Sequence, residues 1–143
     1  MRLLFGQDAA VADWVRRHIP HMATDFGPSS AIGVTTEDGQ PLAGVVFHDY
    51  QPAYGTIQLS AAAISPRWAT KRIVGRMLRY PFMELKVNKV WTATEQKNER
   101  ALKFNKGVGF MPEATLRHHF GRKNHAVICG MMDFEYRERY GQV

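Results

Sequence analysis

Three stretches of the chain carry hydrophobic residues at every third or fourth position, the spacing that places side chains on one face of an α-helix. The first stretch covers 8–18, where Asp8 stands in the position of an acidic N-cap. The second contains 73–78 and reaches a kink or an end at Tyr80-Pro81. The third covers 98–108 and stops at the glycine that follows it. The pattern therefore predicts three helices.

Short runs rich in β-branched and apolar residues lie around these helices and indicate strands. The Asp38-Gly39 pair between two such runs is a strong signal for a tight hairpin. Residues 20–30 contain two prolines, a glycine and small polar side chains, which is typical of a loop. The predicted strands are 2–5, 31–35, 42–48, 56–64, 87–94, 114–120 and 126–134.

The order of these elements is strand and helix, then three strands, then helix, strand and helix, then two strands. Neither an alternating doubly wound sheet nor a β-sandwich has this order. It predicts a mixed α/β (α+β) fold in which one sheet carries helices on both faces. With 143 residues, the chain has the size of one domain, so we expect a single domain over 1–143.

The composition narrows the class of protein. With 45% hydrophobic and 22% charged residues, the chain is a globular protein and not a disordered one. It has one cysteine, Cys129, which we expect to be a buried, inert thiol, and no apolar run long enough to span a membrane. We therefore expect a cytoplasmic protein without a membrane role. The net charge of +6 favours partners that carry phosphate or carboxylate groups.

The segment that begins at Asn98 carries the strongest motif. Asn98-Glu99-Arg100-Ala101 is followed by Val108-Gly109-Phe110, then by Glu113 and Leu116-Arg117. Asn98 can cap a helix or point its amide at a ligand over the helix N-terminus, and Gly109 lets the chain reverse so that Phe110 enters the core. The motif resembles the N-x-x-A, L-G-F and E-x-x-L-R pattern of the GNAT superfamily of N-acetyltransferases. Over roughly residues 30–134, the resemblance implies a mostly antiparallel sheet of about seven strands and an acetyl-CoA site.

A second piece, 64–78, runs from a strand end into a helix, where the family places its turn for the coenzyme pyrophosphate. A helix N-terminus offers free N–H groups to a diphosphate, and basic side chains add charge. The family often has R-x-x-G-x-G or -A here, whereas this chain has Ala69 for the arginine and Arg72 and Val74 for glycines. The alternative is a solvated basic helix face. The coenzyme-binding residues that the resemblance implies are Ala62, Ala63, Ile64, Thr70, Lys71, Arg72, Ile73, Val74, Gly75, Arg76 and Asn98.

Acetyl transfer to an amine needs a base, donors for the tetrahedral oxyanion and an acid for the leaving thiolate. The family often uses a glutamate on the fourth strand, but 56–64 has no carboxylate. Its frequent acid is a tyrosine before the L-G-F turn, where this chain has Asn105. His48 and Ser60 are the best substitutes by position, followed by His118 or His119. The candidate catalytic residues are therefore His48, Ser60 and Asn105, and backbone N–H groups of 61–63 are candidates for the thioester carbonyl.

Three functions remain open at this stage. The first is an N-acetyltransferase that uses acetyl-CoA and a primary amine of an unidentified small molecule or protein. The second is an inactive acyl-CoA-binding module, because the glutamate and the tyrosine are missing. The third, which we rank last, is a nucleic-acid-binding domain that uses the basic cluster at 67–79. The histidines and Cys129 form no known metal-binding pattern, so we expect no metal. Residues 136–140 are a solvated tail or a dimer contact, so a homodimer is compatible with the sequence.

Overall fold

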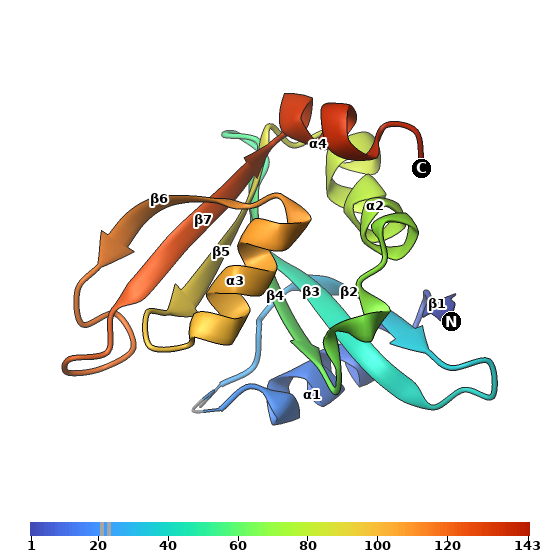
Figure 1. Ribbon diagram of the computed structural model, residues 1–143, viewed down its shortest axis with the longest axis horizontal. Helices are drawn as coiled ribbons and strands as arrows, with labels where there is room; N and C mark the ends of the chain where they lie inside the picture. The colour runs from blue at the N-terminus through green and yellow to red at the C-terminus, as the bar shows by residue number, and fades with distance from the viewer. Residues whose placement is uncertain (21, 23) are drawn as a thin grey trace.

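All the strands belong to one sheet. The computed structural model describes residues 1–20, 22 and 24–143, and its seven strands follow the order β1-β2-β3-β4-β5-β7-β6 (Figure 1). The strands are β1 (Arg2–Leu4), β2 (Ser29–Thr35), β3 (Pro41–Gln51), β4 (Thr56–Ala63), β5 (Lys89–Glu95), β6 (Met111–Leu116) and β7 (Ala126–Met132). Neighbours are antiparallel except β4 and β5, which are parallel. The predicted mixed, mostly antiparallel sheet is confirmed.

Helices cover both faces of the sheet, as predicted. They are α1 (Asp8–His18), α2 (Lys71–Arg79), α3 (Glu99–Val108) and α4 (Asp133–Tyr140), with a 3-10 turn η1 (Pro66–Trp68) and a π-helical turn η2 (Tyr80–Glu84). On one face, Val11 and Val15 of α1 pack against Ala31 and Val46. On the other, α2, α3 and α4 close a larger core around Phe47. In the described ranges, no helix is long and apolar enough to cross a membrane.

Three predicted boundaries are wrong. The strand predicted over 126–134 ends at Met132, because α4 begins at Asp133. Asp8 is the first residue of α1, and Gln7 occupies the N-cap without a side-chain hydrogen bond. The carboxylate of Asp8 instead lies in the first turn, where the helix dipole favours a negative charge. The strand predicted over 114–120 covers Met111–Leu116, so His118 and His119 lie in a turn. His118 has a positive φ of 56°, which interrupts an extended strand.

The C-terminal segment forms a helix that the sequence pattern did not indicate. Tyr136 and Tyr140 of α4 are 5% and 2% exposed, and the Tyr136 hydroxyl donates a hydrogen bond of 3.2 Å to the carbonyl of Gly75 in α2. Both tyrosines therefore pack inside their own chain. The alternative of a solvated tail at 136–140 is wrong, and the dimer contact stays a prediction, because residues 137–139 on the other side of α4 are exposed.

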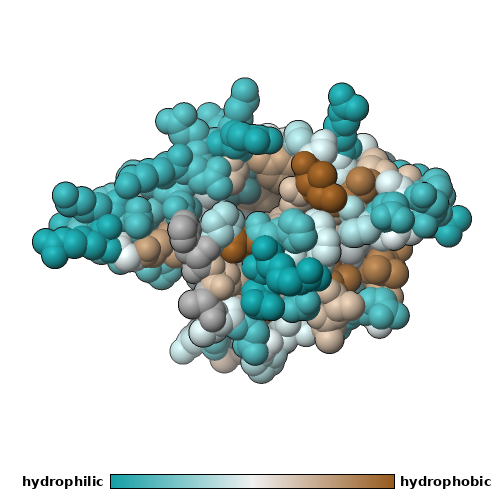
Figure 2. Space-filling model, turned by 90° about the horizontal axis from the view of Figure 1, so that it is seen from below, coloured by the Kyte–Doolittle hydropathy of each residue, from teal (hydrophilic) through white to brown (hydrophobic). Residues whose placement is uncertain are grey.

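The hairpin of β6 and β7 projects from the rest of the molecule. Every residue of β6 is exposed, and so are Arg117, Arg122 and Lys123 in the turn that follows. Figure 2 shows the projection as a hydrophilic arm at its left, beside a hollow surrounded by less polar residues. That view looks at the side of the molecule where β4 and β5 end, which is the side of the candidate site.

Candidate active site

β4 and β5 lie side by side only where they begin. Three residue pairs join them, from Thr56 and Lys89 to Gln58 and Trp91. After that, β4 stays paired with β3 as far as Ala63, and β5 stays paired with β7 as far as Glu95. The two parallel strands therefore separate, as their diverging arrows show in Figure 1. We call the opening between the unpaired parts of β4 and β5 the fork.

Two amides of β4 point into the fork. The N–H of Ile64 donates to the carbonyl of Leu42, on the β3 side, at 2.9 Å. Because successive amides of a strand point to opposite edges, the N–H groups of Ala63 and Ala61 point towards β5. Both alanines are exposed although β4 is the central strand of the sheet. The fork can therefore offer backbone donors to the carbonyl of a ligand.

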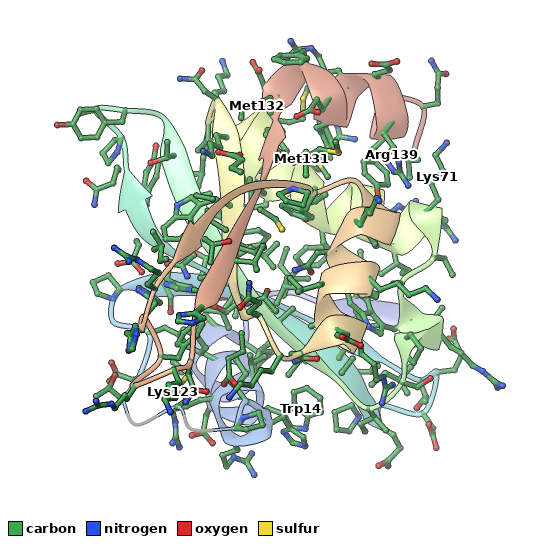
Figure 3. All side chains as sticks on the ribbon, turned by 60° about the vertical axis from the view of Figure 1, so that its left-hand side comes forward. Trp14, Lys71, Lys123, Met131, Met132 and Arg139 are labelled. Carbon is green, nitrogen blue, oxygen red and sulfur yellow. The ribbon has the colours of Figure 1, made fainter. Side chains whose placement is uncertain are left out.

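α2 begins directly after β4 and η1. Thr70 is its N-cap, since the Thr70 hydroxyl accepts a hydrogen bond of 3.2 Å from the N–H of Ile73. Three basic side chains of the helix, with the C-terminal residues beside them, line an open hollow of about 420 Å³. Figure 3 shows Lys71 extending away from the ribbon at this end of α2. The lining residues are Lys71, Arg72, Arg76, Gln142 and Val143.

Not all of the expected coenzyme residues of α2 offer a side chain to a ligand. Ile73 and Val74 are 7% and 6% exposed and belong to the core, and Gly75 packs against Tyr140 of α4. Lys71, Arg72 and Arg76 are exposed. The helix therefore presents its charged side to solvent, and its apolar side anchors it to the sheet. Arg72 and Val74, which replace the usual glycines, point in opposite senses: one to solvent and one into the core.

Trp68 joins the two predicted coenzyme segments, and Asn98 caps the helix of the second. Trp68 of η1 is 5% exposed and packs against Phe104 of α3 with 5.7 Å between ring centroids. Asn98 caps α3 through Oδ1, which accepts a hydrogen bond of 3.2 Å from the N–H of Ala101. Gly109 ends the helix with a φ of 112°, and Phe110 is 3% exposed in the core. The cap, the glycine stop and the core position of Phe110 are confirmed.

His48 and Ser60, two of the candidate catalytic residues, are in contact. Nε2 of His48 lies 2.8 Å from Oγ of Ser60, and Nδ1 of His48 lies 2.6 Å from Oδ2 of Asp49. The imidazole is 7% exposed, and Phe26 packs against it at 5.0 Å between ring centroids. Ser60 is the second residue after Gln58, where the pairing of β4 with β5 ends. The contact therefore lies at the closed end of the fork.

Asp49 is a functional candidate that sequence reasoning missed. A β-bulge separates the pairs that His48 and Gln51 make with β4, and Asp49 in this bulge has a left-handed φ of 52°. Asp is one of the few residues that tolerate this conformation, and bulges often re-aim a side chain. The only signal in the sequence was the His48-Asp49 pair at a strand end.

Asn105 forms its hydrogen bond away from the contact between His48 and Ser60. Its side-chain N–H donates to Oγ1 of Thr94 at 3.0 Å and so joins α3 to the end of β5. An amide carries no acidic proton at neutral pH, so Asn105 cannot replace a tyrosine as an acid. His118 also has a structural role, because its Nδ1 accepts from the N–H of Lys123.

The described residues include no group of three or more His, Cys, Asp and Glu that could hold a metal ion. Cys129 is 2% exposed in β7, as predicted for a buried thiol. Burial raises the pKa of this thiol, so the reactive thiolate is disfavoured.

Searches by sequence give no relative: no protein-family model matches the chain, and no curated protein matches it. Solved structures of spermidine N-acetyltransferase from Vibrio cholerae do match in shape. One, of a point mutant, has a TM-score of 0.77 at 15% sequence identity and covers 97% of this chain and 99% of its own. Another, in complex with manganese ions, has a TM-score of 0.74 at 15% identity, with 96% and 95% covered. A dodecameric form in an intermediate state has a TM-score of 0.68 at 17% identity, with 79% and 70% covered.

Two of these three matches extend over almost the full length of both chains. At such low identity the likeness concerns the fold, which is also what the motif at Asn98 implies. The chain therefore shares the fold of these N-acetyltransferase structures, as the resemblance to the GNAT superfamily predicts.

Proposed function

We propose that this protein is a single-domain, cytoplasmic N-acetyltransferase that transfers an acetyl group from acetyl-CoA to a primary amine. The observation that carries the proposal is the fork, in which the N–H groups of Ala61 and Ala63 lack strand partners on the β5 side and belong to exposed residues. Unpaired donors on a central strand need a ligand or water to bond, and an acyl-CoA has amide and thioester carbonyls to accept from them. The neighbouring N-acetyltransferase structures support this choice of ligand.

The start of α2 suits the diphosphate of the coenzyme. A helix N-terminus carries a partial positive charge, and Lys71, Arg72 and Arg76 add three full charges around an open hollow. The Trp68 contact with Phe104 holds this end of α2 against α3. The acyl-CoA would therefore bind with its diphosphate at α2 and its thioester in the fork.

His48 is our candidate for the base that accepts the proton of the amine. Its imidazole lies at the closed end of the fork, next to Ser60, and Asp49 can stabilise the positive charge that the ring gains. The transfer step forms the N–C bond to the acetyl group and breaks the C–S bond of the thioester. N–H groups at Ala61 and Ala63 are the candidate donors for the oxyanion.

An inactive acyl-CoA-binding module is the second candidate function. It is favoured by one observation: Asn105 occupies the position of the usual tyrosine and bonds to Thr94, so no side chain there can protonate the leaving thiolate. Under this alternative the fork and α2 keep their roles in binding, and the acetyl group is never transferred.

A thermal-shift titration with acetyl-CoA tests the binding step, because a ligand that binds only the folded state raises its stability as the ligand concentration rises. We expect saturable shifts with acetyl-CoA and coenzyme A and none with ATP. The double variant Arg72→Ala, Arg76→Ala should weaken binding about tenfold or more, since a bond between a charged group and phosphate contributes about 1.5–3 kcal/mol. Arg79→Ala removes the same charge from the far end of α2 and is the matched control.

Turnover is tested separately by following coenzyme A release with a thiol reagent. The acceptor panel should contain small primary amines, peptides with free amino groups, and spermidine, which is named for the neighbouring structures. Release that depends on one acceptor establishes the enzyme. Saturable binding with no release across the panel favours the inactive module, and no binding at millimolar ligand contradicts both. Size measurement in solution would test for a homodimer.

A further inference from the structure

The hydrogen-bond partners of His48 determine which of its two ring nitrogens carries the proton. A carboxylate only accepts hydrogen bonds, so the 2.6 Å contact with Asp49 requires a proton on Nδ1 of His48. In the neutral ring, Nε2 then carries a lone pair and accepts the hydroxyl proton of Ser60 at 2.8 Å. Ser60 is therefore hydrogen-bonded to a base that is itself oriented by a carboxylate. This arrangement activates a serine oxygen for attack on a carbonyl.

Burial positions His48, and a bulge in the backbone positions Asp49. His48 is 7% exposed, with Phe26 packed against its ring. The bulge in β3 puts Asp49 into a left-handed φ of 52°, which brings a carboxylate back onto the ring of the residue before it. Aspartate tolerates this backbone conformation better than most residues, and bulges are common next to active sites.

An oxyanion donor follows Ser60 in the chain. The N–H of Ala61 points into the fork, and the side chain of Ala61 is exposed. In serine hydrolases, the amide that follows the nucleophile often donates to the oxyanion. Ser60 itself is partly exposed and so accessible to a small acyl compound.

From this geometry we infer that Ser60 is a nucleophile and that the protein hydrolyses activated acyl esters through a Ser60–His48–Asp49 centre. In the first step, Oγ of Ser60 forms a bond to the acyl carbon, its proton passes to Nε2 of His48, and the bond to the leaving group breaks. His48 returns that proton to the leaving group. Water then attacks the acyl-serine, gives a proton to His48, and releases the carboxylic acid while Ser60 regains its proton.

This activity needs neither coenzyme A nor an amine, so it stands or falls separately from the proposed acetyl transfer. The test uses the full chain with p-nitrophenyl acetate. We expect a burst of p-nitrophenolate equal to the amount of protein, followed by slower steady release. We also expect one acetyl group on the intact protein by mass spectrometry, and peptide mapping should place it on Ser60.

Variants decide which residue carries the acetyl group. Ser60→Ala should abolish both the burst and the adduct, and Asp49→Asn, an exposed substitution, should slow acylation about 10²-fold. Ser30→Ala is the matched control, because Ser30 lies on β2 and its hydroxyl is bonded to Tyr80, not to a histidine. It should leave the burst unchanged. No burst from the unaltered protein, an adduct that survives Ser60→Ala, or an adduct mapped to another residue would overturn the inference.

Discussion

Gly44 of β3 allows α1 to lie directly on the sheet. A Cβ at this position would stand 2.6 Å from Cγ2 of Val15 and 3.1 Å from Cγ1 of Val11, whereas carbon atoms pack at about 3.5–4.0 Å. Val15 is fully buried, and a β-branched side chain in a helix has one strongly preferred rotamer. The helix must therefore move away by roughly 1 Å to accept the methyl group of Gly44→Ala. We expect a loss of about 1–3 kcal/mol in the free energy of unfolding, the usual range for overpacking.

Urea denaturation followed by circular dichroism measures this loss. Gly33→Ala on β2 is the control: its Cβ would stand 3.2 Å from Cγ2 of Val11, so its cost should be smaller. Val15→Ala removes the methyl group that the new Cβ meets. The loss in the free energy of unfolding caused by Val15→Ala should therefore be smaller by at least about 1 kcal/mol in the Gly44→Ala protein than in the unaltered protein. Equal costs in the two backgrounds, or a Gly44→Ala protein as stable as the original, would refute the close packing of α1 on β3.

Three further outcomes can be measured on the same protein. Gly107→Ala in α3 places a methyl group where nothing lies within 4 Å, so it should raise the free energy of unfolding by about 0.5–1 kcal/mol in the same urea assay. Thr70→Ala removes the cap of α2 and should lower the free energy of unfolding by about 1 kcal/mol. It should also reduce the thermal shift with acetyl-CoA, whereas Thr70→Ser should preserve both the stability and the shift. Burial raises the pKa of Tyr136 and Tyr140 above the ordinary value of 10.0, so the unfolded chain loses these protons first as the pH rises. Titration of the two tyrosines should therefore leave stability constant below pH 10 and lower it above pH 10. The double variant Tyr136→Phe, Tyr140→Phe should show a smaller alkaline loss of stability in thermal unfolding measured over a series of pH values.

The local features of the fold could be predicted from the sequence because each depends on neighbours in the chain. Asn98 caps α3 and Gly109 ends it, since both roles need only the residues of one or two turns. The apolar spacing over 8–18 and 73–78 likewise marks the faces of α1 and α2 that are buried. The C-terminal helix escaped prediction because its two buried tyrosines are stabilised by α2, more than fifty residues away in the chain.

For the candidate site, too, the sequence predicted some features and only the tertiary structure decided the others. Residue types and position in the chain were enough to select His48 and Ser60, but they could not show that these residues touch. Their contact depends on the register of β3 with β4, and Asp49 joins them through a bulge in that pairing. The fork depends on where the pairing of β4 with β5 stops. Hydrogen bonds between strands depend on both partners, so the sequence of one strand does not determine them. The sequence alone therefore determined most of the helices and strands and the candidate residues they carry, and the tertiary structure decided which of these residues meet.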